Sequence, residues 1–529
     1  MPVNLWGIRR PALAMLLALS AAACGSTAYQ HGKGLGAGGQ ASAGNGLGAP
    51  GDSTASGAGG PASAAAAGGA PGASSSGRAS GSAPGPVAAG SSPASGGGTS
   101  AAAHGSLGNP VGVTDTSIFI GLYYTVNGAA ANQAIGGNGI TQGDEKADQQ
   151  ILIDDINAHG GVAGRKLVPV WHQVDALTTQ TYAQIYQAMC ADWTQDHHVF
   201  AAFGGPTDTL RQCLHNAGVL HITDDLTSSD SATFARFPYY IEISLMNLDR
   251  IAAEEVPALS AQGYFSGWDA TISQPGASPA KVGVLTYDSD TFVHAVKGVL
   301  LPALAGAGHP AADAAYVSYP QSQADAGNIS AQVSSAILRF RQEGVDHVLI
   351  VDERALLTLF FLNQAESQHF FPRYGFNSQN GTEALLEPGD VPKEQVNGAL
   401  GFGWAPILDI SSTQDPDNGP YANDARRSCI SLMKAHGQSY ANPNAEAIAL
   451  LNCNEFRLLK RALELGPTPI SRDSFMAGLN RIGSSFQSTQ TFAIRLDATH
   501  RDGAAAVRYW AFDGGCGCMR YTSGDQPLP

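Results

Sequence analysis

The chain has 529 residues, of which 43% are hydrophobic and only 14% charged, and its formal net charge is −15. From residue 109 onward it carries 25 Lys and Arg against 43 Asp and Glu. A surface this acidic repels phosphate backbones, which excludes nucleic acid as an expected partner. About 420 residues follow this point, enough for two hydrophobic cores of ordinary size.

The first residues have the pattern of an export signal. Arg9 and Arg10 precede an apolar run at residues 12–19, and small residues at 21–23 lead to Cys24. The run is too short to cross a bilayer core of about 30 Å and is typical of a signal peptide. The pattern predicts a signal peptide over residues 1–23 and lipid on Cys24, as in a bacterial lipobox. The alternative is a plain secretory signal with an unmodified Cys24.

Residues 24–108 are rich in Gly, Ala, Ser and Pro, and residues 31–108 contain no Phe, Tyr or Trp. Such a segment buries too little apolar area to offset an ordering cost of about 1–2 kcal/mol per residue. We therefore predict a disordered linker over 24–108. A G-x-G-x-x-G match at 34–39 follows no strand and opens no helix, so it is an accident of composition.

From residue 116, short apolar strands alternate with amphipathic helices. We expect strands at 117–124, 166–171, 199–205, 281–286 and 345–351, and helices at 143–158, 181–193, 291–305 and 355–368. This alternation predicts an α/β fold with doubly wound parallel sheets. The length exceeds one such sheet, so we expect two Rossmann-like lobes with a ligand cleft beyond the carboxyl ends of their strands.

Residues 157–167, Asn-Ala-His-Gly-Gly-Val-Ala-Gly-Arg-Lys-Leu, carry a specific resemblance. They resemble the "N-x-x-G-G-hydrophobic-x-G-(R/K)-x-hydrophobic" stretch of type I periplasmic solute-binding proteins, in the branched-chain amino-acid-binding (Leu/Ile/Val-binding) group of ABC importers. Further similar segments follow in the same order: 120–122 ahead of 127–128, 203–207, 345–350 before 364–365, and 454–465 followed by 492–497. The resemblance spans roughly residues 115–515. The double glycine itself ends a helix and turns the chain into the next strand.

The resemblance implies a hinge and an interlobe cleft, with lobe one at 115–243 plus 400–485 and lobe two at 244–399 plus 486–520. It implies a monomeric extracytoplasmic lipoprotein, anchored to the bacterial cell membrane only by its N-terminal lipid. The protein would capture a small polar, amino-acid-like ligand for an ABC permease, without a cofactor or metal. The alternative is a ligand-sensing or scaffold lipoprotein on the same fold without transport.

In lobe one the resemblance assigns ligand binding to hydroxyl residues at strand ends. Thr207 fits the position after the third strand, and Thr227 matches the threonine after the fourth. Asp224 and Asp225 depart from the family pattern, and two carboxylates repel a bound carboxylate unless one is protonated or turned away. Asp225 therefore favours a ligand with a cationic or hydroxyl-rich end, unless both aspartates only cap the following turn.

In lobe two, Phe292 stands where relatives place an aromatic residue over the ligand, and Tyr287 lies at the same strand end. Arg354 follows the strand that ends at Val351 and offers a planar fork to an anion. Gln379 lies after the last expected lobe-two strand and supplies hydrogen-bonding groups. The alternative for each is loop capping or a solvated surface position.

Six cysteines remain after Cys24, and six allow 15 pairings. Cys190 and Cys213 lie on the helices before and after the third strand, which can lie side by side, and relatives often have a bridge here. Cys429 and Cys453 lie on successive helices and form the next expected pair. Cys516 and Cys518 would close a very small ring. Only this last pair is closely spaced, so a zinc site is the weaker interpretation.

The chain lacks the motifs of the common hydrolases and nucleotide-binding enzymes, and we predict that it is not an enzyme. Residues 263–267 contain a serine, but it is not at the central position of the G-x-S-x-G motif that forms a nucleophile elbow. His197 and His198 are adjacent and not at the i, i+4 spacing of zinc hydrolases, and G-x-x-x-x-G-K-[ST] is absent.

Overall fold

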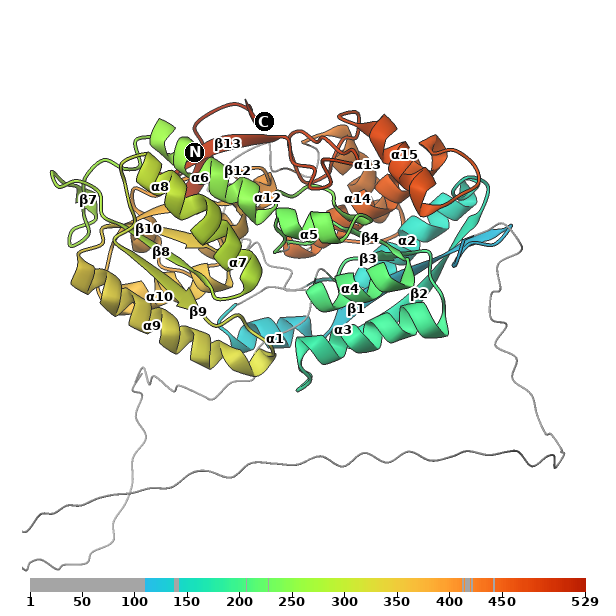
Figure 1. Cartoon of the computed structure of the whole chain (residues 1–529), viewed down its shortest axis with the longest axis horizontal. Helices are drawn as coiled ribbons and strands as arrows, with labels where there is room; N and C mark the ends of the chain where they lie inside the picture. Colours follow the sequence, from blue (N-terminus) through green and yellow to red (C-terminus); the bar gives the residue numbers. More distant parts are fainter. Residues whose placement is uncertain are drawn as a thin grey trace, which may run out of the picture. The chain divides into compact units, whose positions relative to one another are not determined.

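The computed structural model describes residues 110–137, 142–205, 207–226, 228–411, 413, 419, 422–440 and 443–529. These residues form two α/β lobes, each built on a mainly parallel sheet (Figure 1). The doubly wound fold expected from the sequence is therefore confirmed. Cys24, the expected signal peptide and linker, and Thr227 lie outside the described residues.

The first lobe contains a five-stranded sheet in the order β2-β1-β3-β4-β5, with every pairing parallel. Its strands are β1 (Ser117–Val126), β2 (Lys166–Asp175), β3 (Ala201–Phe203), β4 (Leu220–Thr223) and β5 (Tyr240–Glu242). The central strand β3 and its neighbour β4 are buried along their whole length. Helices cover both faces of such a sheet, which is why its strands are continuous apolar runs.

The helices of this lobe come from two parts of the chain. They are α1 (Gly128–Ala134), α2 (Glu145–Ala158), α3 (Tyr182–Ala191) with the π-helical turn η1 (Asp192–Asp196), α4 (Asp208–Ala217), α5 (Ser231–Arg236), α13 (Asp424–Ala435), α14 (Pro443–Leu465) and α15 (Arg472–Ile482). Helix α14 packs against α2, although about 300 residues separate them. The α2 helix ends at the double glycine as expected: Gly160 and Gly161 have φ of 94° and 74°, and Gly161 N donates to Ile156 O at 2.8 Å.

The second lobe contains an eight-stranded sheet in the order β14-β13-β12-β11-β10-β8-β9, with β15 paired to β13. Its strands are β8 (Val282–Tyr287), β9 (Asp313–Val317), β10 (His347–Val351), β11 (Arg373–Asn377), β12 (Leu400–Gly403), β13 (Ala506–Asp513), β14 (Cys518–Tyr521) and β15 (Gln526–Pro527). A separate hairpin pairs β6 (Trp268–Asp269) with β7 (Gln274–Pro275). Strand β12, which we expected in lobe one, belongs to this sheet, because it pairs with β11 and β13.

The remaining helices belong to this lobe and its margins. They are α6 (Leu248–Ala261), α7 (Asp290–His294), the π-helical turn η2 (Ala295–Leu300), α8 (Leu301–Gly306), η3 (Gln323–Asp325), α9 (Ala326–Glu343), α10 (Leu356–Ser367), η4 (Ser378–Asn380), α11 (Thr382–Leu386), η5 (Lys393–Val396) and α12 (Pro406–Asp409). No helix in the described ranges is both long enough and apolar enough to cross a membrane.

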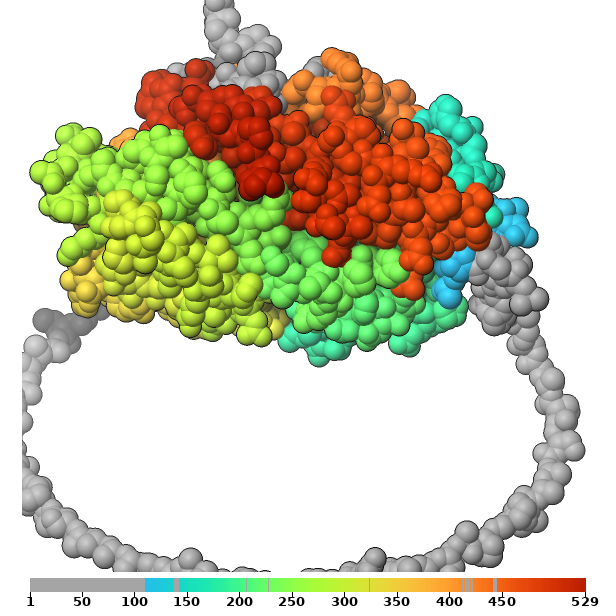
Figure 2. Space-filling view, turned by 45° about the horizontal axis from the view of Figure 1, so that its top comes forward, coloured from blue at the N-terminus to red at the C-terminus, as the bar shows by residue number. Residues whose placement is uncertain are grey.

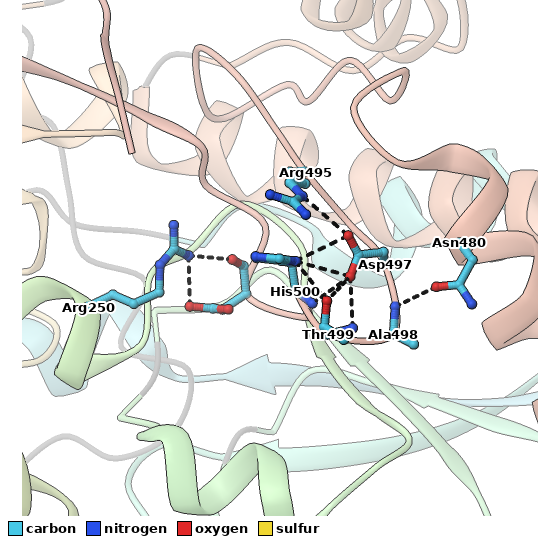
Figure 3. A network of polar contacts seen from close by, with 8 residues as sticks. Arg250, Asn480, Arg495, Asp497, Ala498, Thr499 and His500 are labelled. Atoms are coloured by element: carbon cyan, nitrogen blue, oxygen red, sulfur yellow. Dashed lines mark hydrogen bonds and ion pairs between the residues drawn. The ribbon is translucent and has the colours of Figure 1, made fainter. Parts of the chain in front are cut away.

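Two segments that join the lobes run side by side. Glu242 N donates to Arg501 O at 2.7 Å, and Gly503 N donates to Glu242 O at 3.0 Å. Arg250 holds the second segment in place, because its Nη1 donates to the backbone carbonyl of Asp502 at 2.7 Å and to the Asp502 carboxylate at 2.9 Å. The turn before this segment is held by the Asp497 carboxylate, which forms hydrogen bonds with the side chains of Arg495, Thr499 and His500 (Figure 3). The crossing region is therefore held by backbone pairing and by buried charge.

The end of the chain contributes to both lobes. In the space-filling view, orange and red residues lie over the cyan-to-green lobe and also over the green-to-yellow lobe (Figure 2). This follows from the topology, because α13 to α15 pack on the first lobe while β13 to β15 complete the second sheet. Each lobe therefore needs distant parts of the sequence to complete its core.

Candidate functional site: an interlobe cavity

A cavity of about 300 Å³ lies between the lobes at the carboxyl ends of their strands. The first lobe lines it with Tyr182, Ala183, Tyr186, Thr207, Asp208, Thr209, Arg211 and Ser228; the second lobe lines it with Ser289, Asp290, Thr291, Tyr319, Pro320 and Gln321. Small-molecule sites in proteins have volumes of about 300–1,000 Å³. The size and the two-sided lining are those of a small-ligand site.

Two helix starts border the cavity from opposite lobes. Thr207 caps α4 by accepting a hydrogen bond from Leu210 N, and α7 begins at Asp290. The first N–H groups of a helix have no acceptor within the helix, and side-chain hydroxyls add further donors and acceptors. The cavity therefore offers hydrogen bonds to a polar ligand from both sides.

The charges at the first-lobe wall are largely neutralised within the protein. Asp208 pairs with Arg211 at 2.5 Å and with Arg236 at 2.7 Å. Burial opposes the charge of Arg211, but Tyr240, Asp208 and Glu242 raise its pKa above the ordinary value. On the opposite wall, Asp290 is an exposed acidic residue at the start of α7 that lines the cavity.

Direct contacts join the lobes around the cavity. Tyr182 N donates to Gln321 O at 2.9 Å, and Arg354 Nε donates to Leu226 O at 2.8 Å. Within the second lobe, the Tyr319 hydroxyl donates to Glu353 Oε1 at 2.5 Å, which fixes the position of Tyr319 at the cavity wall. The structure therefore holds the two lobes in contact.

The sequence-predicted first-lobe residues occupy different environments. Thr207 lies in the cavity wall. Asp225 does not line this cavity: its carboxylate is buried and accepts the Tyr123 hydroxyl at 2.9 Å. Asp224 is also buried and accepts Ser244 N at 2.7 Å. The partners that the structure gives these two carboxylates, Tyr123 and Ser244, lie far along the chain, so both side chains help to hold distant segments together.

Both of the expected second-lobe aromatics are core residues. Phe292 is fully buried, and Tyr287 is 1% exposed. Their rings meet edge to face with centroids 5.1 Å apart, and neither lines the cavity. Phe292 therefore does not face this cavity, because α7 turns its ring inward against β8, and Tyr319 lines the cavity wall.

Arg354 and Gln379 likewise differ from the expectation. Gln379 is buried, and its backbone carbonyl accepts Ala355 N at 3.1 Å. Arg354 is half-buried and reaches the first lobe through the Leu226 carbonyl. Its guanidinium is thus engaged by the protein itself.

Three tyrosines line the cavity that were not expected from the sequence. Tyr182 and Tyr186 lie one helical turn apart at the start of α3, and Tyr319 follows β9. A tyrosine pair at i, i+4 on a helix that follows a strand could have predicted these cavity-lining residues, because both side chains then lie on one face of the helix.

The structure contains three disulfides: the two pairs expected from the sequence, and the Cys516–Cys518 pair that the sequence left open. Cys190–Cys213 joins α3 to α4 with Cα atoms 6.3 Å apart, and Cys429–Cys453 joins α13 to α14 at 6.1 Å. Cys516–Cys518 closes the turn before β14. Because α3 and α4 both line the cavity, the first bridge stabilises its wall.

No protein-family model and no curated protein matches the chain. Solved structures do. A possible leucine/isoleucine/valine-binding protein from Rhodopirellula baltica SH 1 is 14% identical, with a TM-score of 0.53 over 78% of this chain and 98% of that one. A solute-binding protein of an ABC transporter from R. palustris in complex with 4-hydroxybenzoate has the same values.

A fatty acid ABC transporter substrate-binding protein from Thermomonospora curvata is also 14% identical, with a TM-score of 0.51 over 79% of this chain and 96% of that chain. At this identity the likeness shows the fold, and it spans nearly the whole of each neighbour. Together with the paired parallel sheets and the cavity between them, it shows that this chain has the two-lobed fold of the type I periplasmic solute-binding proteins of ABC transporters.

Proposed function

We propose that this protein is an extracytoplasmic solute-binding protein that captures a small polar ligand between its lobes and delivers it to an ABC permease. The observation that carries the proposal is the cavity of about 300 Å³ lined from both lobes. A ligand that contacts both lobes stabilises their closed arrangement, because the closed state gains contacts from both sides. The permease then recognises the closed form.

The lining favours a ligand with hydroxyl or amino groups. Hydroxyls surround the cavity on Thr207, Thr209, Ser228, Ser289 and Thr291, and aromatic rings on Tyr182, Tyr186 and Tyr319. The Asp290 carboxylate accepts hydrogen bonds and repels an anion placed beside it. The solved neighbours named above bind an aromatic acid or are named for fatty acids and branched amino acids, so the fold accepts varied ligands.

Filling the cavity is expected to abolish or strongly weaken binding. The full chain is denatured to release its small molecules, which mass spectrometry identifies, and binding is then measured by calorimetric titration. Thr209→Trp places a large ring at the cavity wall and should weaken the affinity by at least about tenfold, or about 1.4 kcal/mol.

Gln212→Trp is the matched control, because Gln212 lies on the exposed side of the same helix α4. It should bind as the unmodified protein does. Equal affinities for the two variants, with equal thermal stability, would show that the ligand binds elsewhere.

We also propose that Cys24 anchors the protein to the membrane. Its position after an apolar run and small residues supports lipidation. Intact-mass measurement of protein extracted from membranes should show the loss of residues 1–23 and the added mass of acyl chains. Cys24→Ser should release the protein from the membrane fraction; an unmodified Cys24 in a secreted form would contradict the proposal.

A further inference from the structure

A second cavity, of about 160 Å³, is also lined from both lobes. Helix α13 of the first lobe contributes Asn423 and Arg426, and strand β13 of the second contributes Arg508. We call it the α13–β13 cavity. It shares no lining residue with the interlobe cavity described above, and its volume is far above the roughly 10–15 Å³ that one water molecule needs. A molecule bound here would therefore be distinct from a solute in the interlobe cavity.

Arg426 brings a buried positive charge to the α13–β13 cavity. The residue is only 3% exposed, and its backbone N–H donates to Asn423 Oδ1 at 2.9 Å in the first turn of α13. Burial lowers the pKa of Arg426 to about 10, while Glu446 and Tyr521 act in the opposite direction. The guanidinium is therefore charged at neutral pH. A buried charge is stable only where acceptors or an opposite charge compensate for the lost water.

Arg508 brings a second guanidinium from the other lobe, and its neighbours hold it in place. Its Nε donates to Asp525 Oδ1 at 2.6 Å, and the group lies over the Phe492 ring, 4.2 Å from the ring centroid. Asp525 lines the cavity too, so this pair adds little net charge. A guanidinium carries five N–H donors in one plane, enough to serve Asp525 and a further oxyanion.

Thr491 supplies a hydroxyl that the protein itself leaves unused. The residue lines the cavity and is 5% exposed, and its Oγ1 has no hydrogen-bond partner among the residues that the structure describes. Burying a hydroxyl without a partner costs stability, and nearly all buried polar groups in native proteins do have one. A hydroxyl in this state beside two guanidinium groups points to a ligand that accepts hydrogen bonds.

The start of α13 adds a partial positive charge at the same wall. This helix is 12 residues long, and its N-cap Asn423 lines the cavity. The Asn423 and Gln487 side chains accept the N–H groups of Arg426 and Ala425, so the helix acts mainly through its dipole, which places roughly half a positive charge at the N-terminus. In a chain of net charge −15, this wall therefore favours an anion.

We propose that the α13–β13 cavity binds a small oxyanion, a carboxylate or a phosphate, through Arg426, Arg508 and the Thr491 hydroxyl. The anion compensates for the buried charge of Arg426 and contacts α13 of the first lobe and β13 of the second. It therefore acts as an effector that stabilises the contact between the lobes, and it is not the transported solute. The test below uses no solute, so its failure leaves the proposed function untouched.

Calorimetric titration of the full chain with sodium phosphate and, separately, with sodium acetate measures binding at constant pH and ionic strength. One of the two salts should bind saturably with a Kd below about 10 mM, and the salt that binds identifies the class of anion. Arg426→Gln should weaken this binding by at least about tenfold. Thr491→Val should weaken it by about fivefold without lowering the thermal stability of the anion-free protein, because the hydroxyl has no partner to lose.

Arg427→Gln is the matched control. Arg427 is the next residue on α13, half of its side chain is exposed, and it pairs with Asp424 outside the cavity. The substitution removes the same charge from the same helix and should leave oxyanion binding unchanged. Thr209→Trp, which fills the interlobe cavity, should leave it unchanged as well, because the two cavities share no lining residue.

Three results would overturn the proposal. The first is that neither salt binds saturably at concentrations up to about 10 mM. The second is binding that Thr491→Val leaves unchanged, which decides the matter even if Arg426→Gln does not fold. The third is binding that Arg427→Gln or Thr209→Trp weakens as much as Thr491→Val does, since the anion would then respond to the overall charge or occupy the interlobe cavity.

Discussion

Replacing Phe292 with alanine is expected to lower the free energy of unfolding by about 3–5 kcal/mol while leaving ligand affinity within about threefold. The ring is fully buried and packs edge to face on Tyr287, with the centroids 5.1 Å apart. Deleting it removes buried apolar contact and leaves a void that the close-packed core fills only in part. Equilibrium denaturation measures the stability, and calorimetric titration below the transition measures the affinity.

Phe340→Ala is the matched control for this prediction. Phe340 is equally buried in the same lobe, on α9, and its ring packs on Phe361 at 6.2 Å. Both variants should lose similar stability and bind similarly. A Phe292 variant of normal stability that binds at least tenfold more weakly would place the ring against the ligand and restore the expectation drawn from the sequence.

Removal of the Cys190–Cys213 bridge by a double alanine substitution should lower the free energy of unfolding by about 3.5 kcal/mol, from the loop-closure entropy of a cross-link about 25 residues long. The two cysteines are 23 residues apart in the sequence. The variant should also bind ligand more weakly, because α3 and α4 form one wall of the cavity. Denaturant melts and titrations under identical oxidising conditions measure both effects.

The Cys516–Cys518 pair offers the comparison within the same chain. Its sequence separation is only 2, so the same relation predicts a loss of about 1.6 kcal/mol. Non-reducing peptide mapping establishes beforehand that each bridge is present. Equal stability losses for the two double variants would contradict an origin in loop closure, and a Cys190 linked to a second-lobe cysteine would contradict the fold.

Local patterns were enough to predict the class of the fold. Short apolar strands alternating with amphipathic helices leave little choice besides parallel sheets covered on both faces. The glycines at 160–161 ended α2 where expected because only a residue without a side chain adopts consecutive positive φ at low cost. The bridge between Cys190 and Cys213 followed from the same topology, since helices that flank one strand can lie together.

The exit of the chain from the second sheet was harder to predict. Strand β12 has the composition of either lobe, and its assignment depends on pairing with β13, which lies about 100 residues later. Pairing of this kind is a long-range choice made by the completed sheet. The sequence around residues 400–403 does not indicate that this strand pairs with β13.

The sequence by itself located the strand ends where a cavity forms, because parallel strands bring their carboxyl ends to one edge. Thr207 was identified at one of these strand ends through the resemblance, which places a hydroxyl residue after the third strand. The sequence could not decide which neighbouring side chain faces the cavity: Phe292 turns into the core while Tyr319 lines the wall. That choice depends on turn dihedral angles and on packing against distant elements. The contact of Arg354 with the Leu226 carbonyl was likewise decided only by the tertiary structure, because two residues from different lobes become neighbours only when both sheets are complete and in contact.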